Sequence, residues 1–278
     1  MLYLILAILF SAMISVMMRL SEKYISNDMS MLAMNYVTCS LLSAIYAGPA
    51  NLVPQVDGFG IALWLGVISG ILYLGSFLLL HWNITQNGVV LPPTFMRLGV
   101  LVPITMSIVL FREMPGVSQL IGYVGALAAI LLIHFDGGSG KANKRWGLIA
   151  LLIGGGLTDA MAKVYEQMGS PGLKDQYLFY TFLTALVLCV GLILLKKQRL
   201  GKMELLFGML IGIPNYISSR FLLLSLSHVP AVIAYPTYSV GAIIVVSTAG
   251  LLLFREKFSK RRTLAMGLIL VSLVLLNL

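Results

Sequence analysis

Charged residues are scarce in this 278-residue sequence: Asp, Glu, Lys and Arg make up 10% of it, whereas hydrophobic residues make up 59%. Soluble domains have about 25% charged residues, and a soluble fold of this length could not bury so much apolar surface. Lipid must therefore be the solvent for most of the chain. Cysteine is scarce as well, and because Cys39 and Cys189 both lie inside apolar runs, no disulfide framework is implied.

Motifs for metals, nucleotides and catalysis are also lacking. Residues 136–141 resemble a phosphate-binding loop, but Phe135 and Ala142 stand where that loop needs Gly and Ser or Thr. An enzyme inside the membrane would need a nucleophile with its base, or a set of metal ligands, within the apolar runs. Asp159 has no His or Glu placed to act with it, so we expect no enzyme, no metal and no cofactor. The histidines are dispersed along the chain, at His81, His134 and His228.

Long apolar runs are what the sequence has in abundance. A helix needs about 20 consecutive apolar residues to cross the hydrocarbon core of a bilayer. The runs predict an all-α integral membrane protein with ten transmembrane helices, joined by connectors too short to hold a soluble domain. They are residues 2–19, 30–48, 59–82, 89–110, 117–134, 147–168, 177–195, 203–226, 231–254 and 263–278.

An internal repeat divides the chain into two halves. A shift of 143 residues superimposes the string Leu-Phe-Arg-Glu at 110–113 on the same string at 253–256, and Pro-Thr-Phe at 93–95 on Pro-Thr-Tyr at 236–238. Five helices in each half is an odd number, so the second half enters the membrane from the opposite side. The result is an inverted-topology repeat, as in many secondary transporters. The expected divisions are a first five-helix repeat at 1–136, a linker at 137–145 and a second five-helix repeat at 146–278.

Each half resembles the EamA-type repeat of the drug/metabolite transporter (DMT) superfamily. The resemblance covers essentially the whole chain and lies in residues 86–93 and 111–122 of the first half and 230–236 and 254–267 of the second. It implies ten helices, with helices 1, 3, 4, 6, 8 and 9 around a central cavity and helices 5 and 10 at the periphery. Many relatives carry a basic N-terminal tail, which this sequence lacks. We expect a multi-pass protein of the cell membrane, the inner membrane of a bacterium, as a monomer or homodimer.

Basic residues are distributed unevenly between the connectors. Lys and Arg favour cytoplasmic loops. Fourteen of the 19 basic residues follow the first, fifth, seventh and ninth runs, whereas only Arg112 and Lys174 lie in connectors of the opposite parity. This distribution predicts that both termini face the outside, although the family resemblance implies termini that face the cytoplasm. It also explains the net charge of +9 without nucleic acid as a partner.

Four ionisable side chains fall inside the apolar runs: Arg97, Asp159, Lys163 and Arg220. Each costs roughly 2.5 to 3.5 kcal/mol to insert, so such a group normally faces a cavity or a partner. Asp159 and Lys163 are four residues apart on one helical face, and they can pair with each other or take part in binding. Arg97 and Arg220 have no acid close to them in their own helices and predict a pathway for a carboxylate or phosphate. Arg220 could instead extend to the nearer membrane surface.

Uncharged polar side chains could complete a pocket for an organic solute, since a tyrosine offers an apolar face and one hydroxyl. Packing within the helix bundle is the alternative role for each of them. The candidates are Asn35, Tyr73, Asn215, Tyr216, Tyr235 and Tyr238.

Prolines predict where helices are interrupted. We expect Pro92, Pro93 and Pro103 to interrupt the fourth helix, Pro214 the eighth and Pro236 the ninth. Interrupted spans at matching positions of two halves point to a binding site. Pro103 could merely kink its helix for packing.

Together these features predict a membrane transporter that moves a small anionic or zwitterionic metabolite, amino-acid-like or phosphorylated, by alternating access. Its partners are then the solute, the lipid bilayer and a coupling proton that Asp159 could carry. Three alternatives stay open: a flippase for a phosphate-bearing lipid, which would use the same arginines, a broad-specificity drug or metabolite exporter, and a membrane scaffold that transports nothing.

The uneven distribution of basic residues generates a prediction about orientation. Single cysteines placed near Lys144 and Lys197 should resist membrane-impermeant thiol reagents in intact cells, because both connectors are expected in the cytoplasm. Labelling is measured before and after the cells are permeabilised. Ready labelling of both cysteines in intact cells would reverse the predicted orientation.

Overall fold

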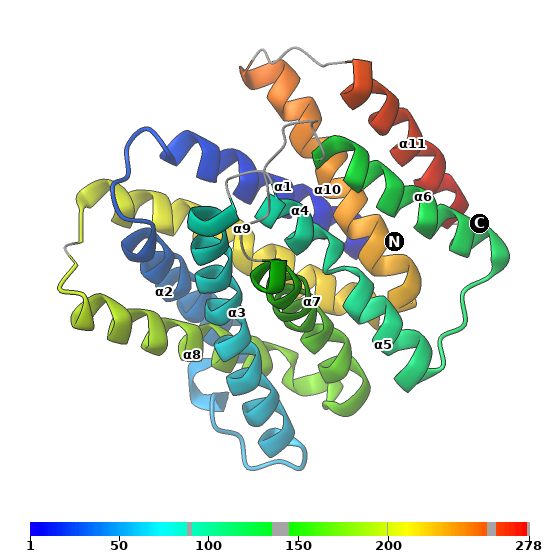
Figure 1. Ribbon diagram of the computed structural model, residues 1–278. Helices are drawn as coiled ribbons and strands as arrows, with labels where there is room; N and C mark the ends of the chain where they lie inside the picture. The colour runs from blue at the N-terminus through cyan, green and yellow to red at the C-terminus, as the bar shows by residue number, and fades with distance from the viewer. Residues whose placement is uncertain (88–90, 135–144, 199, 255–259, 277–278) are drawn as a thin grey trace. The chain divides into compact units, whose positions relative to one another are not determined.

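The computed structural model describes residues 1–87, 91–134, 145–198, 200–254 and 260–276 (Figure 1). All regular structure in these residues is helical, and they contain no strand. The α-helices are α1 (Leu2–Ser21), α2 (Asp28–Ala47), α3 (Phe59–Asn87), α4 (Leu91–Leu98), α5 (Leu101–Phe111), α6 (Val117–His134), α7 (Arg145–Met168), α8 (Lys174–Leu195), α9 (Lys202–Leu226), α10 (Ala231–Phe254) and α11 (Lys260–Leu276), with short 3-10 helices at Pro49–Asn51 and Pro171–Leu173.

Seven helices of the described residues are long and apolar enough to cross a membrane by length and composition: α1, α2, α3, α7, α8, α9 and α10. Shorter apolar helices of the same kind are α5, α6 and α11. The expectation of an all-helical chain with many apolar spans is confirmed. The count of ten spans and the inverted repeat stay predictions.

The fourth apolar run holds two helices, α4 and α5, that are separated at Gly99 and Val100. The N–H of Gly99 donates to the carbonyls of Phe95 and Met96, each at 3.1 Å, and the Gly99 carbonyl accepts from the N–H of Val102 at 2.9 Å. Pro103 has no N–H to donate to the Gly99 carbonyl four residues earlier, which accounts for the break at this position.

The other prolines do not break their helices. Pro214 and Pro236 lie inside α9 and α10, which continue on both sides of them, so the expected interruptions there were wrong. Pro92 and Pro93 are the second and third residues of α4. Proline is tolerated in a first turn because its missing N–H would have no partner within the helix.

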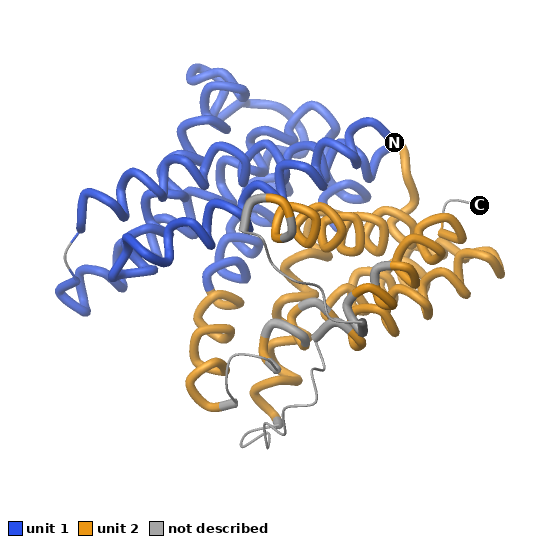
Figure 2. The backbone as a smooth tube through the Cα atoms, turned by 90° about the horizontal axis from the view of Figure 1, so that it is seen from above, with its two compact units in different colours: residues 1–74, 164–227 blue, residues 75–163, 228–278 orange. Residues whose placement is uncertain are grey.

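Two compact units divide the chain (Figure 2). Unit 1 comprises residues 1–74 and 164–227, and unit 2 comprises residues 75–163 and 228–278. Each unit combines segments from both of the expected sequence halves. The linker expected at 137–145 lies outside the described residues except for its last position.

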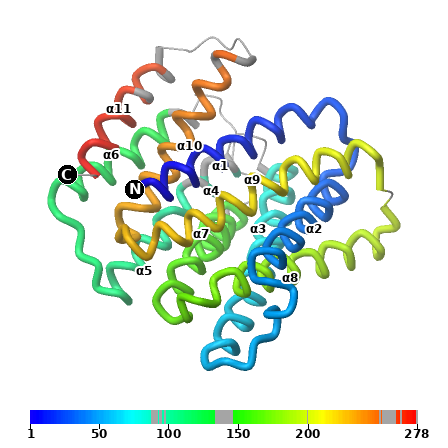
Figure 3. Tube along the Cα trace, turned by 180° about the vertical axis from the view of Figure 1, so that it is seen from behind, coloured from blue at the N-terminus to red at the C-terminus, as the bar shows by residue number. Residues whose placement is uncertain are grey.

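Unit 1 is built around α9, which packs along α1 and α2, while α2 also packs along α8 (Figure 3). Gly208 and Gly212, one turn apart on α9, allow the close approach to α2. A Cβ on Gly208 would lie 2.5 Å from the carbonyl oxygen of Met31, and one on Gly212 would lie 2.5 Å from Cβ of Thr38. Small residues at this spacing are a common basis for helix packing in membranes.

A second pair of glycines brings α3 against α8 in unit 1. A Cβ on Gly66 would lie 2.9 Å from the carbonyl oxygen of Tyr177, and one on Gly70 would lie 2.5 Å from that of Thr181. Between the two glycines, the Ser69 hydroxyl is 2.9 Å from the hydroxyl of Tyr177. Close packing and one polar contact therefore fix this helix pair.

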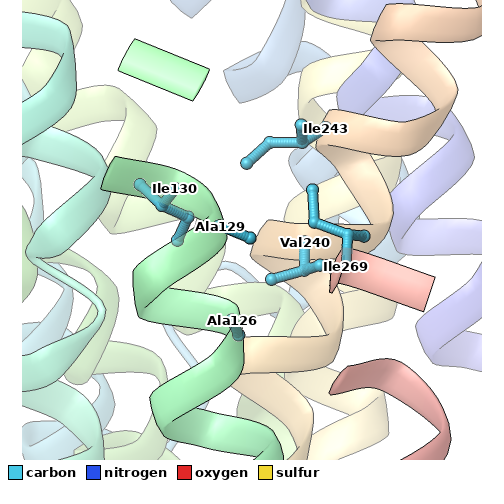
Figure 4. Close-up of a cluster of buried hydrophobic side chains, with 6 residues drawn as sticks. All are labelled: Ala126, Ala129, Ile130, Val240, Ile243 and Ile269. Carbon is cyan, nitrogen blue, oxygen red and sulfur yellow. The ribbon is translucent and has the colours of Figure 1, made fainter. Parts of the chain in front are cut away.

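Unit 2 has its core where α6, α10 and α11 meet (Figure 4). On α6, Gly122 allows the backbone of α11 to approach, because a Cβ there would lie 2.9 Å from the carbonyl oxygen of Ser272. Elsewhere in the unit, the buried amide of Asn83 on α3 donates to the carbonyl of Gly147 on α7 at 3.0 Å. The buried core side chains are Ala126, Ala129, Ile130, Val240, Ile243 and Ile269.

The close contact between α9 and α2 predicts a difference between two glycine substitutions. Gly212→Ala places a methyl group against Thr38 and should cost about 1 to 3 kcal/mol of stability. The matched control is Gly191→Ala on α8, where a Cβ would meet no atom within 4 Å; it should be neutral or stabilising by up to about 1 kcal/mol. Thermal unfolding in detergent measures both, and equal stability of the two variants would contradict the packing described for α9.

Candidate functional site

Unit 1 contains an ion pair stacked on an aromatic ring, in a group of four residues that we call the Arg220 cluster: Tyr46, Asp175, Tyr216 and Arg220. Nε of Arg220 donates to Oδ1 of Asp175 at 2.7 Å, and Nη2 donates to Oδ2 at 3.2 Å. The Tyr216 hydroxyl donates to the same Oδ1 at 3.2 Å. The guanidinium carbon lies 4.6 Å from the centre of the Tyr46 ring, within the range of a cation–π contact.

The helices bring these residues together at their ends. Tyr46 is the penultimate residue of α2, Asp175 is the second residue of α8, and Arg220 lies six residues before the end of α9. The expectation that Arg220 has no acid to neutralise it was therefore wrong. Its partner lies 45 residues away in the sequence, and a search within its own helix could not find it.

A run of aromatic rings joins the Arg220 cluster to a further predicted residue, Tyr73. The Tyr73 ring packs edge-on against Phe182 at 6.0 Å between centroids, and Phe182 packs edge-on against Tyr216 at 6.5 Å. Tyr36 approaches Phe182 from another side at 6.5 Å. Tyr216 and Phe182 are fully buried, so unit 1 places an aromatic surface next to a bidentate ion pair.

The two asparagines expected in the pocket contact each other in the same unit. Nδ2 of Asn215 donates to Oδ1 of Asn35 at 3.1 Å. Nearby, the thiol of Cys39 donates to the carbonyl of Gly212 at 3.3 Å. Asn35 is buried and Asn215 is partly buried. This amide pair joins α2 to α9, which favours the packing role over the binding role for Asn35.

Unit 2 contains a second ion pair, in a group that we call the Lys163 cluster: Glu113, Asp159, Lys163, Ala231 and Tyr235. Nζ of Lys163 lies 2.7 Å from Oε1 of Glu113, and their side chains are 3% and 18% exposed. Oε2 of Glu113 accepts the N–H of Ala231, the first residue of α10, at 2.8 Å. A carboxylate at a helix N-terminus is favourable because the first N–H groups have no partner within the helix.

The predicted residues Asp159 and Tyr235 also belong to the Lys163 cluster. The Tyr235 hydroxyl donates to the backbone carbonyl of Asp159 at 2.7 Å, so α10 is joined to α7. Tyr235 is buried and Asp159 is exposed. The partner described for Lys163 is Glu113, which the sequence interpretation did not consider. The predicted pairing of Lys163 with Asp159 stays a prediction.

For two further predicted residues, Arg97 and Tyr238, the structure shows little beyond their places in the helices. Arg97 belongs to α4, but its side chain lies outside the described part of the structure. Tyr238 lies on α10, one turn beyond Tyr235, and is partly buried. Among the described residues, no group of three or more His, Cys, Asp or Glu side chains could hold a metal ion.

Comparison with known proteins finds a family model, a relative and a solved structure that resemble all or part of the chain. Residues 176–269 match the family model of the Small Multidrug Resistance protein. An uncharacterized protein of Haemophilus influenzae is 25% identical over 271 residues, which cover 92% of this chain and 91% of that protein. A crystal structure of a protein with 13% sequence identity has a TM-score of 0.76, over 99% of this chain and 94% of that chain.

These three comparisons support different conclusions. The crystal structure supports the fold alone at such low identity. The family match covers α9 and α10 and most of α8, and together with the apolar helices it supports a multi-pass membrane protein. Membership of the DMT superfamily stays a prediction. The narrower resemblance to the EamA type stays a prediction.

The Lys163 cluster predicts energetic coupling between two residues 50 positions apart. Glu113→Gln should cost about 3 to 5 kcal/mol, because it removes a carboxylate from a buried ammonium group. Adding Lys163→Met should restore part of the loss, and chemical unfolding in detergent measures the cycle. Strictly additive losses would show that the pair is not coupled.

Two controls complete that cycle. Glu22→Gln makes the same charge change at an exposed residue just after α1 and should alter stability by less than about 0.5 kcal/mol. The sequence predicts that Lys163 pairs with Asp159. If the double variant Asp159→Asn with Lys163→Gln is more stable than Asp159→Asn alone, Lys163 is shared between two carboxylates.

Proposed function

We propose that this chain is a membrane transporter that moves a small anionic or zwitterionic metabolite by alternating access. Its ten spans would form two inverted five-helix halves of the EamA type in the cell membrane. The proposal is supported by the apolar helices and by the match of residues 176–269 to a family named for multidrug resistance. That match points to transport rather than to catalysis.

The observation that carries the choice of solute is the Arg220 cluster. A guanidinium group presents a planar set of donors that suits a carboxylate or phosphate, and in unit 1 it already holds a carboxylate in that bidentate manner. The exposed ring of Tyr46 supplies apolar surface beside it. An organic solute with one anionic group matches both features.

The other predicted residues take supporting roles in this proposal. Arg97 stays proposed, from the sequence, as a residue that binds the negative group of the solute. Within unit 1, Arg220 is proposed for the same role and Tyr73 for contact with the apolar part of the solute. The Lys163 cluster holds α7 against α10 or gates the pathway. Asp159 is the exposed carboxylate of that cluster and is the candidate carrier of a coupling proton.

Export of many different drugs is the second candidate, and it is favoured by the name of the matching family. An exporter of cationic compounds would need a carboxylate to attract them, and Asp159 is the exposed carboxylate of the Lys163 cluster. The two candidates differ in the sign of charge that the protein recognises. A thermal-shift screen of the purified protein with anionic, zwitterionic and cationic compounds separates them, since a bound ligand stabilises by about 2.7 kcal/mol at 100 times its Kd.

Transport is then measured in reconstituted vesicles with the compound that gives the largest shift. Arg97→Lys keeps the charge but removes the planar fork, so flux should fall roughly 10-fold or more while the amount of folded protein is unchanged. Arg97→Leu should reduce flux further and ease membrane insertion, because the cost of burying the charge disappears. The matched control is Arg19→Leu, at an exposed residue near the end of α1. Full flux in Arg97→Leu would remove Arg97 from the site.

A further inference from the structure

Arg220 is occupied in this structure by a carboxylate of the protein itself. Asp175 takes the edge of the guanidinium group formed by Nε and one Nη nitrogen. This edge offers two parallel donors, which is the geometry that carboxylates and phosphates prefer. A solute anion that uses Arg220 in the same way must therefore compete with Asp175 for the same atoms.

The exposure of the two ion pairs indicates which of them can exchange partners. The side chains of Arg220 and Asp175 are 29% and 20% exposed, so the protein does not close over the pair. Lys163 is only 3% exposed, and the second oxygen of its partner Glu113 is held by the N–H of Ala231. An anion that replaced Glu113 would have to enter a nearly closed site, whereas the Arg220 pair is partly open.

Asp175 would remain stabilised after it has lost Arg220. It lies in the first turn of α8, where the unpaired N–H groups at the start of a helix favour a negative charge. The Tyr216 hydroxyl, which donates to Oδ1 of Asp175, is a second partner that need not leave. The released carboxylate is therefore not left as an isolated charge in a medium of low dielectric constant.

We infer that Asp175 is a specificity-determining residue, because its carboxylate occupies the donor edge of Arg220 and the anionic group of the solute binds by displacing it. This inference rests on the proposed function. The affinity for the solute is then set by a difference in binding free energy at one guanidinium group. The two competitors for that group are the solute anion and the Asp175 carboxylate. A neutral compound of the same shape gains no affinity at Arg220, because it cannot replace the negative charge of Asp175 beside the guanidinium group.

Benzoate and benzamide provide the test, since they share a ring and differ in charge. Titration calorimetry measures the Kd of each compound for the purified full-length protein. Asp175→Asn removes the internal competitor at nearly constant size, so the Kd of benzoate should fall roughly fivefold, which corresponds to about 1 kcal/mol. The Kd of benzamide should not change.

Three further variants separate competition from other effects. Asp28→Asn makes the same charge change at an exposed residue of α2, in the first turn, far along the helix from Tyr46, and should leave the Kd of benzoate unchanged. Arg220→Gln combined with Asp175→Asn should abolish the gain in affinity. Tyr216→Phe removes the hydroxyl that stabilises Asp175 after its displacement, so the Kd of benzoate should rise. Benzoate that binds equally to wild type and folded Asp175→Asn, or to neither, overturns the inference.

A measurement on the wild-type protein covers the case in which Asp175→Asn does not fold. Phenylglyoxal modifies accessible guanidinium groups, and peptide mass spectrometry reports the rate at Arg220. Benzoate should slow that modification and benzamide should not, and equal rates with both compounds overturn the inference. The proposed function fails on a different result, namely the absence of solute flux in vesicles, whereas flux without competition at Asp175 defeats this inference alone.

Discussion

The constraint on which this structure depends is that an ionic group within apolar helices needs a partner. Both ion pairs that the structure describes meet this need at helix ends. Arg220 of α9 is paired with Asp175 at the start of α8, and Lys163 of α7 is paired with Glu113 just after α5. Each pair also contacts a further helix, through the Tyr46 ring of α2 or the first N–H of α10. The charges therefore fix how helix ends meet, and they do so separately in each compact unit.

Much of the fold could be predicted from the sequence, because an apolar run of sufficient length leaves the backbone no alternative to a helix in lipid. The expected runs at 203–226 and 231–254 correspond closely to α9 and α10. The prolines were interpreted less well. Pro103 has no N–H to donate to the carbonyl four residues earlier, and a break appears there, whereas α10 continues through Pro236. Whether a proline breaks a helix depends on which groups of the neighbouring helices contact the carbonyl that lacks its usual donor. A single sequence does not contain that information.

The site could be predicted only in part, for a similar reason. Inspection of the apolar runs found Arg220, Lys163 and several aromatic residues, because a polar residue is conspicuous among apolar ones. It missed Asp175 and Glu113, which stand in or beside short polar connectors where acids are ordinary. For Glu113 a signal existed, because the repeated Leu-Phe-Arg-Glu string includes it. For Asp175 the only signal was its place in the first turn of α8, which many surface acids share.

The sequence repeat relates only one of the four paired charges to a charged residue of the other half. A shift of 143 residues brings Glu113 onto Glu256, so a carboxylate after the fourth and ninth apolar runs is common to both halves, whereas Lys163 is brought onto Leu20. The same shift brings Asp175 onto Leu32 and Arg220 onto Phe77, so the Arg220 cluster has no charged counterpart in the first half. The Arg220 cluster occurs once in the sequence, is partly exposed and lies beside an aromatic ring. Because helix ends can also be packed with apolar residues, as at the equivalent positions of the first half, this asymmetry is one ground for proposing that the cluster serves the solute.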